Sequence, residues 1–409
     1  MPQNNKYKLA IITSHPIQYQ TPLFKILSTD QSIDLKVYFM WTLGTKEQVM
    51  DPEFNRVFKW DLPLLDGYNY ELIKNYSPRP RNTLFGQINL GIVGKLYRDR
   101  PELLLVHGWN SIGNILGVLA AYAFGISVAI HGDNCFSCEA SKPIWKRKIK
   151  KIVLGAFLKK ITAALYMGVE DRKFYEYHGV GSEKLFFMPY STDNDRLVAA
   201  SAKLDKDEIK KSLGLEGKVV LIFFGKLVER KKPEDLLSGY AHLIDQHPEL
   251  KEKVGLVFVG DGILYEEMKG RVKELGSDLV QLAGFKNLSE LPTYFKLGDI
   301  FVIPSVNECW GIVVNEAMCF GLPIIASDTV GCGPDLVQHG YNGFIYKTGD
   351  VVELSERIYE LVVNESKREE FGKKSLEIIK RYNFRSDAEA IIKVLNLLNV
   401  NKKPPFQGG

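Results

Sequence analysis

Short apolar runs alternate with amphipathic stretches along most of this chain, and this alternation limits the folds that it can adopt. Such runs are typical of parallel strands that are buried on both faces, and the stretches between them fit helices or loops. A first series comprises KLAIITS, LKVYFM, ELLLVHG, SVAIHG and AALYMG, and a second comprises VVLIFFGK, VGLVFVGD, LVQLAGF, DIFVIPS, LPIIASD and NGFIYK. We therefore predict an α/β protein with two Rossmann-like domains, each built on a doubly wound sheet.

The length of 409 residues and the hydrophobic content of 45% fit two domains with separate cores. Between the two series lies a polar passage, residues 188–215, which fits a connection between domains better than a strand or a core helix. We place the boundary near residue 200. The predicted segments are an N-terminal domain at 1–200, a C-terminal domain at 201–382, a C-terminal helix at 383–400 and a disordered tail at 401–409. A return of the C-terminal helix to the N-terminal domain is one of the arrangements that we consider.

Charge and hydropathy exclude several classes of protein. Lys and Arg number 53 against 49 Asp and Glu, a formal charge of +4 that is too small to indicate a nucleic-acid partner. The first apolar run is too short for a signal peptide, and no run approaches the ~18 apolar residues of a membrane-spanning helix. We therefore expect a cytoplasmic protein whose contact with a membrane, if any, is peripheral.

The five cysteines are odd in number, and we expect them to be reduced and mostly to pack in the interior. Cys135 and Cys138 form a single CxxC pair, and no second pair follows to complete a zinc site. The sequence therefore favours neither a redox role nor a metal site at these residues.

A basic loop follows the first strand of the second series, in IFFGKLVERKKPEDLL. The strand ends at Gly225, where a glycine allows close approach of the backbone to a ligand. Lys226 and Lys231 follow, and lysine is a compact charge that suits a diphosphate. A solvated basic loop without a ligand is the alternative that this pattern leaves open.

Two further strand ends contain glycine. The turn FVGDG includes Gly262 and by itself indicates only a turn that needs backbone freedom. The segment LAGF ends at Phe285, which either packs in the core or presents an apolar surface to a nucleobase. Without further context, the core position is the more common of the two.

Two glutamates flank the start of a predicted helix in PSVNECWGIVVNEAMCFGLP, residues 304–323. The helix is predicted to begin near Gly311 or Ile312. Glu308 then lies in the preceding loop and Glu316 in the second helical turn. The first turn has free N–H groups and a partial positive charge, which suit phosphate oxygens. Carboxylates on either side accept hydrogen bonds from hydroxyl groups, so the ribose, diphosphate and sugar of a nucleotide sugar fit this layout.

A surface position for Glu316 and a solvated loop position for Glu308 are the ordinary alternative. The neighbours of Glu316 in NEAMCFG are otherwise apolar, which predicts that its side chain is largely buried. An unpartnered buried charge is costly, so a role in ligand binding is favoured.

The passage PSVNECWGIVVNEAMCFGLPIIASD resembles the E-x7-E signature of the retaining GT-B glycosyltransferases of family 4, which transfer sugar from a nucleotide sugar without a metal ion. FFGKLVERKK resembles the phosphate-binding segment of that family, and FVGDG, LAGF, DIFVIPS and GYNGFIY occur in the family's order. The resemblance covers roughly residues 8–385. It implies a GT-B fold in which an acceptor-binding N-terminal domain faces a nucleotide-sugar-binding C-terminal domain across a cleft.

By this resemblance, Glu316 binds the ribose hydroxyls and Glu308 binds the transferred sugar. Lys226 and Lys231 bind the diphosphate, although the family usually has arginine where Lys226 stands, so the bidentate fork is lost. The residues assigned to the donor are Gly225, Lys226, Lys231, Gly262, Phe285, Glu308, Gly311, Ile312, Val313 and Glu316, and those assigned to catalysis are Glu308, Lys231 and His131. The segment VGCGPDLV departs from the family's usual Gly-Gly-x-Pro-Glu and is assigned no ligand contacts.

Polar residues at strand ends of the N-terminal domain are candidates for the acceptor side of the cleft. TSHPIQYQTPLF resembles one subgroup of the family, in which His-Pro replaces a Gly-rich loop. VHGWN and IHGDN end two later strands, and His131 resembles a family position near the donor sugar. A histidine at a strand end is more often structural, but two consecutive His-Gly pairs favour a role in the cleft for at least one. The acceptor or cleft candidates are His15, Gln18, His107, Trp109 and Asp133.

The resemblance also implies a mechanism without a metal cofactor and without a dedicated base, because the leaving phosphate can take the acceptor proton. A nucleotide-sugar epimerase on the same scaffold is the alternative enzyme. An inactive sugar-nucleotide-binding protein is disfavoured, since it need keep neither Glu308 nor Lys231. A hydride-transferring dehydrogenase is excluded, because TSHPIQ stands where its G-x-G-x-x-G turn belongs.

The segment SKPIWKRKIKKIVLGAFLKK, residues 141–160, combines basic and apolar residues in an amphipathic pattern. Such a helix fits the surface of an anionic membrane and a glycan or lipid-linked acceptor. A helix that packs on its own sheet with its lysines in water is an equal alternative. The sequence identifies neither the nucleotide, nor the sugar, nor the acceptor.

Overall fold

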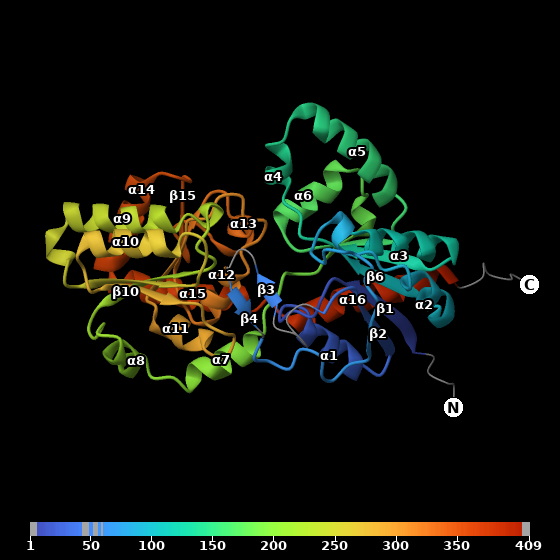
Figure 1. The fold of residues 1–409 in the computed structure, drawn as a ribbon, viewed down its shortest axis with the longest axis horizontal. Helices are drawn as coiled ribbons and strands as arrows, with labels where there is room; N and C mark the ends of the chain where they lie inside the picture. Colours follow the sequence, from blue (N-terminus) through green and yellow to red (C-terminus); the bar gives the residue numbers. More distant parts are fainter. Residues whose placement is uncertain (1–5, 43–48, 52–55, 59, 403–409) are drawn as a thin grey trace, which may run out of the picture. The chain divides into compact units, whose positions relative to one another are not determined.

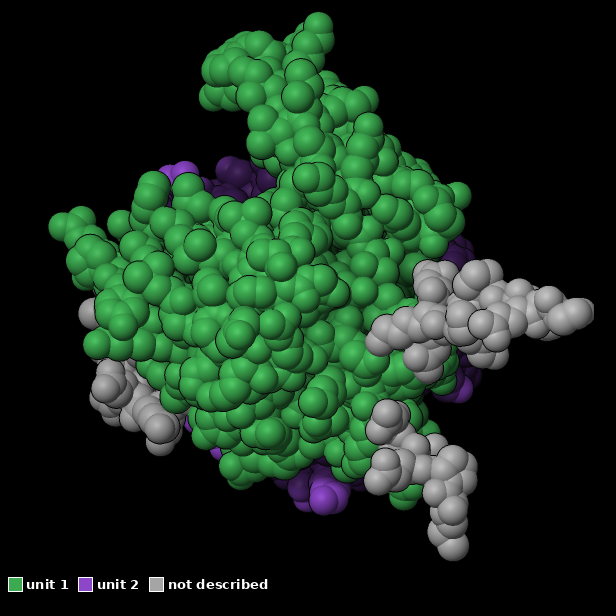
Figure 2. Space-filling view, turned by 90° about the vertical axis from the view of Figure 1, so that its right-hand side faces the viewer, with its two compact units in different colours: residues 1–47, 63–190, 383–409 green, residues 48–62, 191–382 purple. Residues whose placement is uncertain are grey.

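A computed structural model describes residues 6–42, 49–51, 56–58 and 60–402 of the chain (Figure 1). The chain forms two compact units, which Figure 2 colours separately. Unit 1 comprises residues 1–47, 63–190 and 383–409, and unit 2 comprises residues 48–62 and 191–382. The chain therefore passes from unit 1 to unit 2 and back twice, with residues 48–62 and again with residues 191–382.

Unit 1 is built on a parallel sheet of 7 strands in the order β5-β2-β1-β6-β7-β8-β9. The strands are β1 (Tyr7–Thr13), β2 (Ile33–Phe39), β5 (Tyr70–Leu72), β6 (Leu103–His107), β7 (Ser127–His131), β8 (Ala163–Tyr166) and β9 (Leu185–Phe187). The chain runs outward from β1 to β5 and then returns to β6 on the other side of β1. In open α/β sheets, ligands bind beyond the strand ends where the order reverses, which here is between β1 and β6.

Helices cover both faces of this sheet. They are α1 (Thr21–Thr29), η1 (Leu84–Gly86), α2 (Ile92–Asp99), α3 (Ile112–Ala123), α4 (Phe136–Ala140), α5 (Ile144–Leu158), α6 (Val169–Tyr177), η2 (Ser182–Lys184) and α16 (Phe384–Lys402). Leu9 and Ile11 of β1 pack with α1 and α16 on one face. Ala10 and Ile12 pack with α2 and α3 on the other face. The last helix, α16, lies beside α1 (Figure 1), so both ends of the chain complete one core.

Unit 2 is built on a parallel sheet of 6 strands in the order β12-β11-β10-β13-β14-β15. The strands are β10 (Val219–Phe224), β11 (Val254–Val259), β12 (Val280–Gly284), β13 (Ile300–Ile303), β14 (Ile324–Ser327) and β15 (Gly343–Tyr346), and a separate antiparallel pair is formed by β3 (Val49–Asp51) and β4 (Arg56–Phe58). The order reverses between β10 and β13, which makes their carboxyl ends the expected position of a ligand.

The core of unit 2 lies where this sheet meets its helices. The helices are α7 (Asn194–Ala202), α8 (Lys206–Ser212), η3 (Glu229–Lys231), α9 (Pro233–Gln246), η4 (Pro248–Leu250), α10 (Tyr265–Leu275), α11 (Leu291–Leu297), α12 (Val313–Cys319), α13 (Gly333–Leu336), α14 (Val351–Val363) and α15 (Glu365–Ile379). Leu221 and Phe223 of β10 pack with apolar residues of α9 and α14 in one buried cluster.

The predicted fold class, an α/β protein with two Rossmann-like sheets, is confirmed. Every apolar run of both series forms a strand. The prediction omitted β5 and β9, which are edge strands of only three residues each and are not fully buried.

The polar passage at 188–215 was wrongly predicted to lack core helices. It contains α7 and α8, and α7 packs against α11 and α12. Leu197 of α7 is fully buried, although it is a single leucine among polar and small residues.

The predicted disordered tail is corrected in part, because residues 401 and 402 belong to α16. The rest of that tail, residues 403–409, lies outside the described residues. Within the described part of the chain, no helix is both long enough and apolar enough to cross a membrane.

Candidate functional site

The loops after β10 and β11 pack backbone against backbone at the carboxyl edge of the unit 2 sheet. A Cβ atom at Gly260 would overlap the carbonyl oxygen of Gly225. Gly262 lies close to the carbonyl oxygen of Leu227, which accepts a hydrogen bond from the N–H of Leu264 at 3.0 Å. The glycines of FVGDG are therefore needed for this loop packing, and a contact of Gly225 or Gly262 with a ligand stays a prediction.

The helix η3 brings Lys231 to Glu308 at the point where the strand order reverses. The N–H of Val306 donates a 2.7 Å hydrogen bond to the carbonyl oxygen of Arg230, which joins the loops after β10 and β13. The ammonium group of Lys231 forms an ion pair with the Glu308 carboxylate, and their side chains are 13% and 15% exposed. The Arg230 guanidinium lies 3.9 Å from the same carboxylate. Two cationic side chains beside one carboxylate give a net positive charge, which favours binding of a diphosphate.

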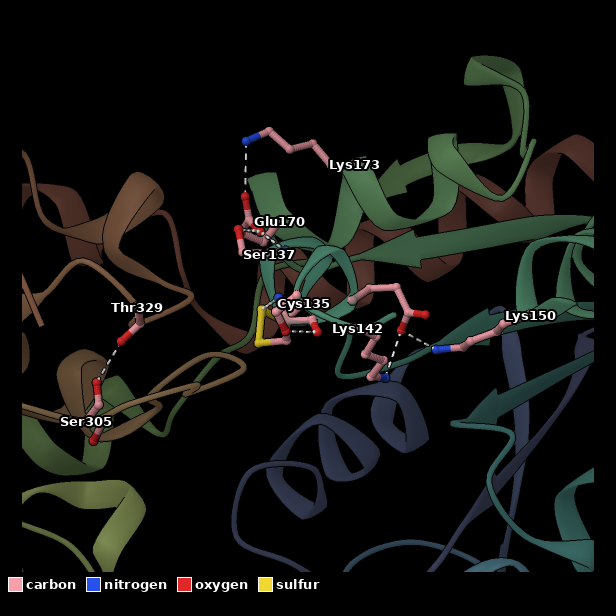
Figure 3. Close-up of a disulfide and its surroundings, with 11 residues drawn as sticks. Cys135, Ser137, Lys142, Lys150, Glu170, Lys173, Ser305 and Thr329 are labelled. Carbon is pink, nitrogen blue, oxygen red and sulfur yellow. Dashed lines mark hydrogen bonds and ion pairs between the residues drawn. A yellow bond between two sulfur atoms is a disulfide. The ribbon is translucent and has the colours of Figure 1, made fainter. Parts of the chain in front are cut away.

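The loop of Glu308 is held by residues that follow β14. The N–H of Glu308 donates to the carbonyl oxygen of Thr329 at 3.3 Å, and the N–H of Gly331 donates to that of Glu308 at 2.8 Å. The Thr329 hydroxyl donates to the carbonyl oxygen of Ser305 at 3.0 Å (Figure 3). A Cβ atom at Gly331 would overlap the carbonyl oxygen of Cys309. Beyond the glycines of VGCGPDLV, no sequence pattern predicts this support.

The start of α12 differs from the prediction. The helix begins at Val313, with Ile312 as its N-cap, because Gly311 adopts a left-handed conformation at a φ of 94°. The indole N–H of buried Trp310 donates to the Asn315 side chain at 2.9 Å and ties the loop to the helix. The first N–H groups of a helix have no partner inside it, so Gly311 to Val313 remain candidates for binding anionic oxygens.

Glu316 lies in the first turn of α12 rather than in the predicted second turn. Its side chain is only 6% exposed. Burial raises the pKa of this carboxyl group from 4.5 to about 7, and the positive charge of Arg196 opposes this effect only in part. Among the described residues, its carboxylate has no hydrogen bond or ion pair. Such a group is costly to bury unless a ligand supplies hydrogen bonds.

Lys226 and Phe285 lie along the same sheet edge, after the strands on either side of β11. Lys226 follows β10 by two residues, and Phe285 directly follows β12. Both side chains are half-buried, so Phe285 is not the fully buried core residue of the alternative interpretation. Their predicted contacts with the diphosphate and the nucleobase stay predictions.

Unit 1 contains a cavity of about 310 Å³ at the reversal point between β1 and β6. Of the sequence candidates, the lining includes His15, His107, Trp109, His131 and Asp133. Gln18 does not line this cavity, and its position facing the cleft stays a prediction.

Gln20 lines the cavity instead of Gln18. Its side chain accepts a 2.7 Å hydrogen bond from the hydroxyl of Thr13 and lies 3.1 Å from the Nδ1 atom of His107. These two contacts hold Gln20 across the first turn after β1. No sequence pattern distinguishes Gln20 from Gln18.

The histidines of this cavity are held in the neutral state. Burial lowers the pKa of His15 to about 4, and burial together with the nearby His131 lowers the pKa of His107 well below its usual value. Burial also lowers the pKa of His131, against an opposing effect of the Leu165 carbonyl. The Nδ1 atom of His131 lies 2.8 Å from the Leu165 carbonyl oxygen, so Nδ1 carries the proton and donates, and Nε2 is an acceptor.

The prediction of reduced cysteines is wrong for Cys135 and Cys138, which form a disulfide (Figure 3). A spacing of two residues at the start of α4 brings the two sulfur atoms together, which a single CxxC pair does not reveal. Cys309, Cys319 and Cys332 form no disulfide, and the last two are buried as predicted.

Two ion-pair groups surround this disulfide (Figure 3). The hydroxyl of Ser137 donates to Glu170 at 2.6 Å, and Lys173 lies 3.0 Å from the same carboxylate. Glu139 accepts from Lys142 at 2.9 Å and from Lys150 at 2.6 Å. Lys150 also lines the unit 1 cavity, so this second group reaches its wall.

The described residues contain no group of three or more His, Cys, Asp or Glu side chains placed to hold a metal ion. Independence from metal remains a prediction from the resemblance. Arg230 and Lys231, near Glu308, are cationic groups of unit 2 that can bind a donor diphosphate.

Comparisons with known proteins indicate a family. Residues 205–377 match the family model described as Glycosyl transferases group 1. Sulfoquinovosyl transferase SQD2 of Arabidopsis thaliana is 32% identical over 313 residues, which cover 72% of this chain and 56% of that protein. A UDP-Gal:alpha-D-GlcNAc-diphosphoundecaprenol alpha-1,3-galactosyltransferase of Escherichia coli is 30% identical over 256 residues, which cover 60% of this chain and 63% of that protein.

Solved structures show the same fold. The crystal structure of Anabaena Alr3699/HepE in complex with UDP and glucose has a TM-score of 0.71 and 17% identity, and the match covers 96% of this chain and 100% of that chain. The predicted GT-B architecture is thereby confirmed. The matches span only 50% to 63% of the length of the first curated relatives.

Proposed function

Because the chain belongs to the group 1 family of glycosyltransferases, we propose that it transfers a sugar from a nucleoside-diphosphate sugar to a hydroxyl group of an acceptor. The proposed transfer retains the anomeric configuration and needs no metal ion. The main support for this proposal is the position of Glu316 in the first turn of α12, after the loop of Glu308. Its carboxylate is buried and has no hydrogen bond or ion pair among the described residues.

The donor lies along the carboxyl edge of the unit 2 sheet in this proposal. Glu316 accepts hydrogen bonds from the ribose hydroxyls, and Glu308 accepts them from the transferred sugar. Lys226 and Lys231 bind the diphosphate, with the N–H groups of residues 311–313. The ion pair between Lys231 and Glu308 supports these roles, because it keeps both side chains at the reversal point before a donor arrives.

The reaction breaks the bond between the anomeric carbon and the diphosphate oxygen. The acceptor oxygen forms its bond to the anomeric carbon from the same face, and its proton passes to the leaving phosphate. Lys231 and the helix N–H groups stabilise the negative charge that develops on the diphosphate. The protein therefore orients the reactants and stabilises charge, and it supplies no nucleophile.

Unit 1 binds the acceptor in this proposal. His131 is buried and neutral, with Nδ1 fixed on Leu165, so Nε2 accepts a hydrogen bond from a sugar hydroxyl. His15, His107, Trp109 and Asp133 line the same cavity and provide further polar and stacking contacts. Both polar and aromatic groups are needed to position a glycan acceptor.

The acceptor is a glycan or a lipid-linked glycan. The name of the Escherichia coli relative states that it acts on GlcNAc-diphosphoundecaprenol and takes galactose from UDP-Gal, which supports this class of acceptor and makes UDP-sugars the first donors to test. The basic segment 141–160 forms α5 for most of its length, and its exposed apolar residues support a peripheral contact with the cytoplasmic face of a membrane.

The test measures donor binding first and turnover second. The purified protein is screened by thermal shift against UDP-, GDP- and ADP-sugars, because a ligand that binds only the folded state raises its stability by about 2.7 kcal/mol at a 100-fold excess over Kd. With the donor found, we expect nucleotide release to rise with added acceptor. Formation of an isomer of the donor sugar would mark an epimerase instead.

Two substitutions assign the roles of the glutamates. We expect Glu316→Ala to weaken the thermal shift, because the ribose loses its acceptor. We expect Glu308→Ala mainly to lower turnover, because its contact is with the transferred sugar. Unchanged binding and turnover in both variants would refute the assignment.

A further inference from the structure

An apolar groove of about 650 Å³ lies between α3 and α5 of unit 1 (both labelled in Figure 1). Leu119 of α3 and Ile149 of α5 line it, and their side chains are 54% and 57% exposed. Trp145, Val153 and Phe157 extend the same wall. An exposed apolar patch of this extent on a protein surface indicates a site that binds a ligand, a partner protein or a membrane.

The groove adjoins the polar cavity of unit 1, because Trp109 and Lys150 line both. Trp109 is fixed in place, since its ring stacks on Phe174 at a centroid distance of 6.0 Å and packs against Gly132. Lys150 is held by its 2.6 Å ion pair with Glu139. Trp109 and Lys150 therefore form a shared border between the apolar groove and a cavity lined by histidines, and a ligand that crosses this border would contact both.

The junction of groove and cavity is positively charged. Residues 141–160 contain eight Lys and Arg residues and no acidic residue. Glu139 is shared by Lys142 and Lys150, and Asp133 lines the cavity beside Lys150, so these two acids stand against eight basic residues. Lys146 lines the groove beside Trp145. An anionic group at the end of an apolar chain would be attracted to this position.

We propose that the groove binds the hydrocarbon chain of a lipid-linked acceptor, with the phosphate or diphosphate of that lipid near Lys146 and Lys150 and its glycan in the cavity beyond Trp109. This inference rests on the proposed function, in which the unit 1 cavity receives the acceptor. It names the acceptor class, an amphiphile with an anionic linkage between chain and sugar.

Contact with a bilayer surface alone would use different residues. The most exposed apolar side chain of α5 is Ile152, at 73%, and it does not line the groove. Ile149 does line it. A chain in the groove depends on Ile149 and not on Ile152, whereas a flat membrane surface would engage both.

The test measures equilibrium binding of farnesyl diphosphate, below its micelle-forming concentration, and of inorganic diphosphate to the full chain. Each methylene group removed from water favours binding about fourfold. We therefore expect farnesyl diphosphate to bind at least about tenfold more tightly than inorganic diphosphate. We expect Ile149→Ser to weaken this binding about fivefold or more, and the matched control Ile152→Ser to leave it unchanged.

Three results would overturn the proposal. Farnesyl diphosphate could bind no more tightly than inorganic diphosphate. Ile149→Ser and Ile152→Ser could weaken binding equally. The protein could bind anionic phosphatidylglycerol vesicles through Ile152 without binding farnesyl diphosphate in solution, which would indicate a membrane surface as the occupant.

A parallel measurement tests the proposed function independently of the groove. The thermal shift by the donor nucleotide depends on unit 2, so we expect it to be the same in the wild type and in both variants. Absence of that shift in the wild type would refute the proposed transferase activity, while binding of farnesyl diphosphate would still decide the groove.

Discussion

The carboxyl group of Glu316 titrates far from its usual range, which makes its contribution to stability measurable. Burial raises its pKa from 4.5 to about 7, and Arg196 offsets this only in part. The unfolded chain therefore releases this proton near pH 4.5 and the folded protein near pH 7. Since each pKa unit corresponds to about 1.4 kcal/mol, the group lowers the free energy of unfolding by about 3 kcal/mol as the pH rises from 4.5 to 7.

The substitution Glu316→Gln keeps the shape of the side chain and removes its titration. Below pH 4.5 the two proteins carry the same charge at this position, so we expect nearly equal stability. At pH 8 we expect the free energy of unfolding of the variant to exceed that of the wild type by up to about 3 kcal/mol. Urea denaturation at pH 4 and pH 8, followed by tryptophan fluorescence, measures this difference.

The same variant should bind the donor nucleotide less well. A hydrogen bond to a charged group is worth about 1.5–3 kcal/mol, so loss of the charged acceptor should weaken binding at least about tenfold. A substitution that stabilises the protein and weakens ligand binding indicates that the original residue serves binding rather than stability. Glu356→Gln, on the exposed face of α14, is the matched control and should change neither quantity. The reasoning fails if the pH dependence of stability is the same in the wild type and in Glu316→Gln.

Three further substitutions test the surroundings of Glu308. Lys231→Ala removes charge from the diphosphate site and should lower the rate of nucleotide release about 100-fold or more, whereas exposed Lys251→Ala should not; equal rates would contradict the site. Glu308→Gln should lower kcat at least about tenfold and leave the nucleotide Kd within about threefold; the reverse pattern would exchange the two glutamate roles. Gly331→Ala forces a Cβ atom against the Cys309 carbonyl, so it should lower the free energy of unfolding by about 1–3 kcal/mol in urea denaturation and should also lower turnover. The control Gly270→Ala places its Cβ atom in open space on α10 and should raise the free energy of unfolding by about 0.5–1 kcal/mol. An unchanged free energy of unfolding in Gly331→Ala would show that the loop adapts freely.

The sheets were predictable because their strands are buried on both faces. A strand in the middle of such a sheet must be apolar along its whole length, as β10 and β13 are, and the run is visible without an alignment. The edge strands β5 and β9 are short and less buried, so the same signal is weak. The helix α7 was missed because a single buried leucine, Leu197, connects it to the core.

The burial of Glu316 was predictable from its apolar neighbours, but the residue at which α12 begins was not. The left-handed backbone of Gly311 delays the helix until Val313, and this conformation depends on the packing of the loop against Val330 and Ile303. The support from Thr329 and Gly331 combines backbone hydrogen bonds with one from the Thr329 hydroxyl, between segments about twenty residues apart, and a pairing at this separation is a product of the fold. The disulfide and the place of Gln20 in the cavity are likewise products of tertiary structure.

A crystal structure of the chain with the nucleoside diphosphate that gives the largest thermal shift would test the central claim most directly. We predict ribose hydroxyls within about 2.5–3.2 Å of the Glu316 carboxylate, and diphosphate oxygens at Lys231 and at the N–H groups that begin α12. A nucleotide bound away from the edge between β10 and β13, with Glu316 still unpartnered, would contradict it.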